Sequence, residues 1–184
     1  MPGARRENRG RNAAAANRRA LLGAARKHFA TDGFAASLTA IARQAGVGQG
    51  SLYRHFPDRI SLAVAVFDDN VAQLEAFAAR PEASLRDVLE LLTEQTVASV
   101  AFIDMLRASD DDSRLRAILD RVTDALDRKL GGARRDGDVH DSVTAGHLLL
   151  AIEMVAALVA KAPAPSRRDL ADRAWAMLRP SIFR

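Results

Sequence analysis

The chain has 184 residues, a formal net charge of +4 and 48% hydrophobic residues, which is enough apolar content for one domain or two small ones. Cysteine is absent, which excludes disulfides, thiolate metal sites and cysteine nucleophiles. The longest apolar stretch, Val143 to Ala160, is interrupted by Gly146, His147 and Glu153. This pattern argues against a membrane span, and the first residues do not resemble a signal peptide, so we expect a cytoplasmic protein.

The charge is unevenly distributed along the chain. Residues 1–59 contain eleven Lys and Arg against three Asp and Glu, and the remaining residues contain sixteen against twenty. A basic end joined to a mildly acidic body indicates that one end meets a polyanion. Residues 1–12 are polar, arginine-rich and without periodicity, which predicts a disordered basic arm. Such an arm could lie in the minor groove of a DNA duplex. A solvated tail that only raises non-specific affinity for a polyanion is favoured, because the release of counterions from the polyanion needs no defined geometry.

Three helices are predicted after this arm. Residues 13–32 carry apolar side chains at helical spacing, and Gly33 can end this helix. Ser37 can cap a short second helix that Gly46 stops, and residues 50–56 form a short third helix. Two short helices joined by a glycine-containing turn constitute a helix-turn-helix.

The rest of the chain is also predicted to be helical, without any alternating strand pattern. One apolar stripe is especially regular and predicts a helix: Leu115, Ile118, Leu119, Val122, Leu126 and Leu130. Gly131 and Gly132 are expected to end this helix. Ser84 starts a long helix expected to run through Leu106, and Ser166 is expected to cap the last helix. The predicted fold is therefore all-α, with a helix-turn-helix domain at 13–58 and a second helical domain at 59–184.

The third short helix carries side chains suited to DNA. Leu52 and Phe56 are four residues apart and face inward, which leaves the polar residues of this helix pointing outward. Gln and Arg make bidentate contacts with base edges, whereas Tyr, Ser and His donate to phosphates. Arg59 lies at a helix start, where the dipole favours an acid and not a cation, so an external anion would explain it.

The stretch from Phe29 to Phe67 resembles the DNA-binding domain of TetR-family regulators. In chain order the matching elements are Phe29 and Gly33, Ser37-Leu38-Thr39-x-Ile41-Ala42, Ala45-Gly46-Val47, Gly50-Ser51-Leu52-Tyr53-x-His55-Phe56, and Arg59 before an apolar helix. The family's common serine after Gly-Val is Gly48 here, and its frequent lysine is Arg59.

This resemblance implies a DNA-binding transcriptional regulator, usually a repressor that a small-molecule effector releases from double-stranded DNA. It also implies a role for each matching residue. Phosphate contacts are expected from Ser37 and Thr39, base contacts from Gln49, Gly50, Ser51 and Arg54, and further backbone contacts from Tyr53, His55 and Arg59.

A dimer is expected because one helix-turn-helix recognises too few base pairs, and such proteins bind near-palindromic operators as pairs. The candidate surface is formed by the helices at 142–161 and 166–178, of which the first is apolar nearly all round. The resemblance implies a four-helix bundle between two copies. The alternative is a helix central to a monomer.

The remaining helices can enclose a hydrophobic effector. Adaptable apolar side chains would suit it, although each is also an ordinary core residue: Phe102, Met105, Leu106, Met154 and Leu158. His147 and Glu153 are polar groups on an apolar helix. They could orient this ligand, contact a neighbouring helix or lie at the dimer interface.

Nothing in the pattern favours catalysis. His140 and Asp141 follow Asp136 and Asp138 closely, but their spacing matches no standard metal site. No nucleophile–base arrangement is evident, so we expect no enzyme activity, metal or cofactor. Two alternatives remain: a DNA-binding regulator without a small-molecule ligand, and a ligand-binding or interaction module with vestigial DNA binding.

Overall fold

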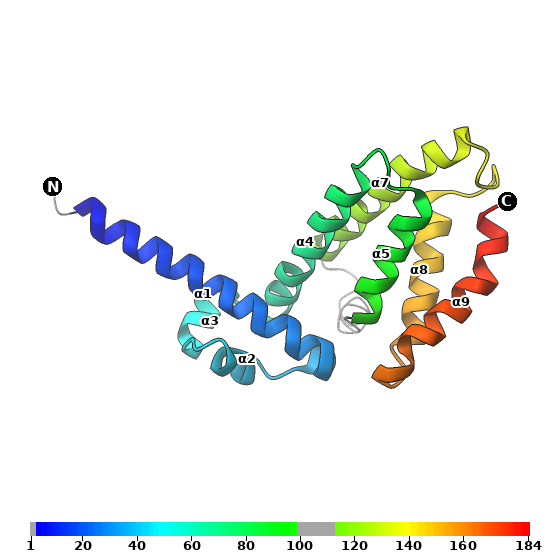
Figure 1. Ribbon diagram of the computed structural model, residues 1–184. Coiled ribbons are helices and arrows are strands. Elements are labelled where there is room, and N and C mark those ends of the chain that lie inside the picture. The colour runs from blue at the N-terminus through cyan, green and yellow to red at the C-terminus, as the bar shows by residue number, and fades with distance from the viewer. Residues whose placement is uncertain (1–2, 99–112) are drawn as a thin grey trace.

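A computed structural model of the protein describes residues 3–98 and 113–184, and these residues are almost entirely helical (Figure 1). The all-α prediction is therefore confirmed. In chain order the elements are α1 (Gly3–Asp32), a 3-10 turn (Gly33–Ala35), α2 (Leu38–Gln44), α3 (Gln49–His55), α4 (Arg59–Ala78), α5 (Leu85–Ala98), α7 (Ser113–Arg135), α8 (Ala145–Val159), a second 3-10 turn (Ala164–Ser166) and α9 (Arg167–Ile182).

The helices form two groups that share α4 (Figure 1). α1, α2 and α3 lie together at one end, and α5, α7, α8 and α9 form the helical body. α4 packs against α1 on one side and most extensively against α7 on the other. The boundary predicted between residues 58 and 59 coincides with the start of this shared helix.

A single apolar cluster connects the two groups. Phe29 of α1, Leu52 of α3 and Leu62 of α4 are completely or almost completely buried in it. The same cluster includes Leu126 of α7 and Leu148 of α8. Because close-packed interiors transmit displacements, a movement in the body can reach the N-terminal helices through α4.

The N-terminal segment differs from the sequence prediction. α1 begins at Gly3, so the structure shows a helix where the sequence predicted a disordered arm over residues 1–12. Alanine and arginine are among the strongest helix formers, and the run Ala13–Ala16 extends the packed part of α1 without a proline break. Intrinsic propensity thus continues the helix where no apolar periodicity was visible.

The end of α7 also differs from the prediction. The helix passes through Gly131 and Gly132 and ends at Arg135. Each glycine costs about 1 kcal/mol relative to alanine in a helix, and burial of Leu130 and Ala133 on both sides of the pair offsets this cost. The reversal occurs at Gly137, whose φ of +77° suits a residue without a Cβ.

Helix caps agree with the sequence at some ends only. Ser37 caps α2 by accepting a bond from the Ala40 amide, and Ser84 forms a reciprocal capping box with Asp87. Ser166 occupies the N-cap position of α9 as predicted, but its hydroxyl makes no capping bond and donates instead to the Pro163 carbonyl, 3.0 Å away. The helix predicted from Ser84 through Leu106 is described only as far as Ala98.

Candidate DNA-binding site

Local sequence features determine how α2 and α3 are oriented. Gly46 ends α2 with a φ of +66°, a left-handed conformation that favours glycine, and turns the chain toward α3. Leu52 and Phe56 are then only 1% and 2% exposed, and α3 packs against α1 and α2. Burial of this side of α3 leaves its polar side exposed to solvent.

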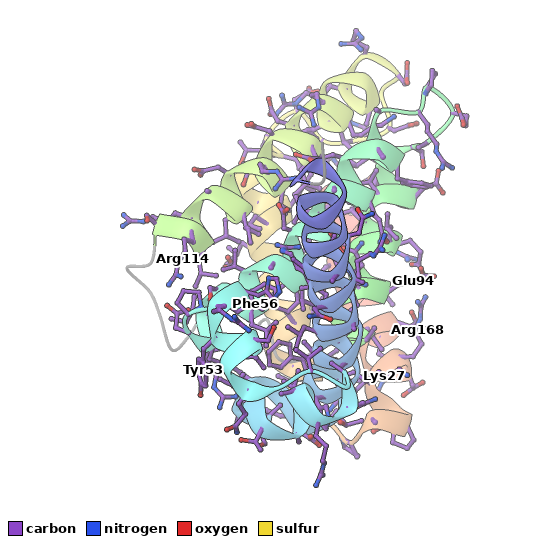
Figure 2. The ribbon with its side chains drawn as sticks, turned by 90° about the vertical axis from the view of Figure 1, so that its left-hand side faces the viewer. Lys27, Tyr53, Phe56, Glu94, Arg114 and Arg168 are labelled. Atoms are coloured by element: carbon purple, nitrogen blue, oxygen red, sulfur yellow. The ribbon has the colours of Figure 1, made fainter. Side chains whose placement is uncertain are left out.

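Figure 2 shows the exposed side of α3, with Tyr53 pointing outward and Phe56 turned toward α1. Tyr53 is 50% exposed. Of the other residues predicted to contact bases or phosphates, Ser37, Thr39, Gln49, Gly50 and Arg54 are exposed, while Ser51, His55 and Arg59 are half-buried. Both short helices therefore expose polar residues to solvent.

The starts of α2 and α3 are joined by a side-chain hydrogen bond. The Gln49 amide nitrogen, Nε2, donates to the Thr39 hydroxyl. Both side chains are exposed, so neither is required by packing of the core. The bond fixes the two predicted contact residues relative to each other, which reduces the conformational entropy they would lose on binding DNA.

Arg59 is placed differently from the other predicted contact residues. Its guanidinium donates to the Phe34 carbonyl at 2.7 Å and to the Ala36 carbonyl, and it lies over the Phe34 ring at 5.7 Å from the centroid. These internal acceptors explain the cation at the start of α4 without an external anion. A phosphate contact by Arg59 stays a prediction, and it would have to share donors with these carbonyls.

Arg18 was grouped by sequence reasoning with the N-terminal arginines that could contact DNA, and not with the helix-turn-helix residues. Its guanidinium lies over the Phe56 ring, 5.3 Å from the centroid, beside the end of α3. The available signal was helical spacing, since Arg18 precedes the buried Leu21, Leu22 and Ala25 by three, four and seven residues. It therefore shares the face of α1 that packs on the helix-turn-helix.

Asp58 caps α4 next to this site and pairs with the body. Its carboxylate accepts from the Ser61 amide at 2.5 Å, and Arg114 of α7 approaches both carboxylate oxygens at 3.4 Å. The bond from Ser61 and the positive charge of Arg114 lower the Asp58 pKa below its ordinary value of 3.8. Asp58 thus joins the start of α4 to the start of the described part of α7.

This lowered pKa predicts a pH-dependent contribution to stability. Because the folded-state pKa of Asp58 lies below its unfolded value, its stabilisation is present above about pH 4 and disappears as pH falls through the folded pKa. We expect wild type to be more stable than Asp58→Asn at pH 7, with a difference that shrinks on acidification below pH 4. Urea unfolding of both proteins across this range measures the difference; Asp127→Asn, at an exposed position of α7, is the control. A difference independent of pH would contradict the role of the charge.

Four of the seven residues predicted to bind an effector, all on α8, belong to the part of the chain that the structure describes. Phe102, Met105 and Leu106 lie outside the described residues. His147 caps α8: its ring Nδ1 accepts from the Thr144 amide, and the Thr144 hydroxyl accepts from the His147 amide, each at 3.2 Å. The remaining three predicted residues are exposed on α8, namely Glu153, Met154 and Leu158.

A small cavity lies between α5 and α9, beneath the buried hydrogen bond from the Trp175 indole to the Thr93 hydroxyl, 2.7 Å long. Its volume is about 20 Å³, which is room for roughly one water molecule, whereas effector pockets measure about 300–1,000 Å³. Within residues 3–98 and 113–184, no three His, Asp or Glu side chains are grouped to hold a metal ion. No described helix is long and apolar enough to cross a membrane.

These observations define a helix-turn-helix DNA-binding protein: a short recognition helix with an exposed polar face, joined through α4 to a helical body. The sequence profile of bacterial regulatory proteins of the tetR family matches residues 21–66, which contain α2, α3 and parts of the two flanking helices. This match identifies residues 21–66 as similar to the TetR-family DNA-binding domain, and the chain shares the fold of a solved TetR transcriptional regulator, as the resemblance implied.

Solved structures with this fold include members of the TetR family. A TetR transcriptional regulator from Streptomyces coelicolor is 26% identical, with a TM-score of 0.67 over 90% of this chain and 98% of that one. A TetR transcription regulatory protein from Mycobacterium vanbaalenii is 29% identical, with a TM-score of 0.57 over 82% and 96%. A gamma-butyrolactone receptor shares the fold at 22% identity, with a TM-score of 0.60 over 93% and 90%. No curated protein matches the chain by sequence.

Proposed function

We propose that this protein is a cytoplasmic homodimeric repressor that binds a near-palindromic operator and is released by a hydrophobic small molecule. The observation that carries the proposal is the combination of an exposed recognition surface on α3 with an exposed apolar row on α8. The first is suited to DNA and the second to a partner copy. A body that shares one core with α4 lies between them.

The apolar row on α8 supports a dimer. Leu150, Met154 and Leu158 are spaced four residues apart and are 53%, 52% and 42% exposed, and Met177 of the neighbouring α9 is 83% exposed. Large apolar side chains gathered on a surface mark protein interfaces. In a dimer built from α8 and α9 of both copies, the two recognition helices would lie about 34–36 Å apart, one turn of DNA.

On the DNA side, we propose that the exposed part of α3 contacts base edges and that its surroundings contact phosphates. Gln49 and Arg54 are the residues with bidentate hydrogen-bonding capacity, and Gly50 and Ser51 lie between them in the same helix. The phosphate contacts would come from Ser37, Thr39, Tyr53, His55 and Arg59.

Release by an effector would act through α4. Arg121 of α7 donates to Glu75 at 2.9 Å and also pairs with Asp68, both on α4, and these bonds raise its pKa further above the ordinary value. An apolar ligand, for which Phe102, Met105 and Leu106 remain candidate contacts from the sequence, would shift this shared helix and the spacing of the recognition helices. Such coupling typically amounts to about 1–3 kcal/mol. The fold shared with a gamma-butyrolactone receptor supports control by a small apolar molecule. Control without a ligand remains the alternative.

The test of DNA recognition is selection of an operator from a random duplex pool. Wild type should enrich a near-palindromic sequence. Arg54→Ala should lose about 1–3 kcal/mol of discrimination at one symmetric pair of positions, while Arg128→Ala, at an exposed position of α7, should enrich the same sequence. Absence of any enriched sequence would contradict the repressor proposal. Thermal melting with a panel of apolar molecules, a γ-butyrolactone included, then tests for an effector by the rise in Tm that ligand binding produces.

A further inference from the structure

The N-terminal extension of α1 is a helix rich in arginine. Residues 1–20 contain six arginines and one glutamate, and the described side chains at 12–20 are exposed apart from the half-buried Asn17. Figure 1 shows this part of α1 projecting beyond α2 and α3. Among the residues whose side chains the structure describes, no acid forms an ion pair with Arg18 or Arg19.

We propose that this extension is a second DNA-binding element, which contacts phosphates flanking the sequence that α3 recognises. The inference rests on the DNA-binding function and adds a surface that the helix-turn-helix does not contain. The extension joins the packed part of α1 at Arg18, whose guanidinium is stacked on the Phe56 ring beside the end of α3. The extension therefore begins next to the recognition helix.

Helical structure gives this charge a fixed place. In a disordered arm the arginines would be spread over many positions, whereas the backbone of α1 is one continuous helix from Gly3 to Asp32. From Arg18 to Gly3 the helix spans about 22 Å at 1.5 Å per residue. That length corresponds to about six base pairs of duplex at 3.4 Å each.

The positive charge of the extension favours DNA as its binding partner. Arg5 and Arg9 are spaced four residues apart, and like charges at this spacing oppose each other and destabilise a helix. A polyanion relieves this repulsion and releases its own counterions. The position next to α3 makes duplex DNA the polyanion that is already nearby.

The first test varies the length of the DNA. Two duplexes carry the operator selected from the random pool, one ending at the operator and one extended by about 10 base pairs on each side. Wild type should bind the longer duplex more tightly and with a steeper salt dependence. The variant Arg5→Gln, Arg6→Gln, Arg9→Gln, Arg11→Gln should bind the short duplex like wild type. On the long duplex its slope of log K against log salt should be shallower by about 0.9 for each phosphate that the variant no longer neutralises.

A second variant separates a fixed helix from a flexible tail. Ala14→Gly with Ala15→Gly keeps every charge but weakens the helix between Arg11 and Arg18 by about 1 kcal/mol at each glycine. It should lose most of the gain from the flanking DNA. Arg128→Gln with Arg135→Gln, which removes charge from exposed positions of α7, should retain that gain.

The outcomes distinguish this inference from the proposed function. If wild type selects no operator, DNA recognition itself fails. If wild type binds its operator equally tightly on both duplex lengths, the second DNA-binding element does not exist. If the double glycine variant keeps the full gain, the arginines act as a flexible tail and the fixed helical contact is wrong.

Discussion

The double variant Leu150→Asp, Met154→Asp should be monomeric at concentrations where the wild-type protein sediments as a dimer. Each of these side chains is about half exposed in the single chain, and full burial of a leucine or methionine contributes about 1.5–3 kcal/mol. Because the two copies are related by a two-fold axis, each substitution occurs twice at the interface. The interface would then also contain unpaired carboxylates from both copies. The monomer should lose most of its affinity for a near-palindromic operator because it contacts one half-site only.

Sedimentation velocity and operator titration measure the two effects together. Ala117→Asp places a carboxylate at an exposed position of α7 and should leave both the dimer and operator affinity unchanged. Helix content by circular dichroism shows whether the double variant remains folded. A folded double variant that still forms dimers as tightly as wild type would rule out the apolar row on α8 as the interface.

Replacement of Phe29 by alanine should destabilise the N-terminal helices by about 3–5 kcal/mol, the usual cost of removing a buried phenylalanine. Phe29 is 0% exposed, and it belongs to the same apolar cluster as Ile41 and Leu52. Whole domains are stable by only about 5–15 kcal/mol. Operator binding should therefore fall sharply, whereas the dimer, built from α8 and α9, should persist.

Urea unfolding followed by circular dichroism gives the stability change, and sedimentation gives the oligomeric state of the same sample. Phe77→Ala is the matched control, because Phe77 of α4 is only half-buried with Arg80 over its ring. It should cost less and should leave operator binding near the wild-type level. A Phe29→Ala protein that unfolds at the wild-type urea concentration would contradict the assigned core.

Local signals made the helix-turn-helix predictable. Ser37 as N-cap, Gly46 as the turn residue and the inward pair Leu52 and Phe56 each act within a few residues of chain, so their effects do not depend on the remainder of the fold. The same holds for the all-α class, because helical periodicity is a property of neighbouring turns. The outward residues of α3 follow once its buried face is known.

Contacts distant in sequence decided the rest. Arg59 has its acceptors on Phe34 and Ala36, which are separated from it by α2 and α3, so the sequence could indicate a cation but not its internal partners. Whether Leu150, Met154 and Leu158 of α8 lie in the core or at the surface depends on how α5, α7 and α9 pack around that helix. Apolar periodicity also underestimated the length of α1, because a helix segment that packs against nothing and is stabilised by alanine and arginine shows no apolar stripe.

Thus the sequence by itself determined the helix-turn-helix, the all-helical class and the polar recognition surface, because these depend on short-range propensities and on the spacing of buried side chains. The tertiary structure alone decided that Arg59 is bound internally and that His147 is exposed to solvent. It also decided that Arg18 lies over Phe56 and that the apolar row of α8 has no cover among the described residues of the chain. Each of these depends on which helices meet in space, and helix pairing is fixed by packing of the whole core.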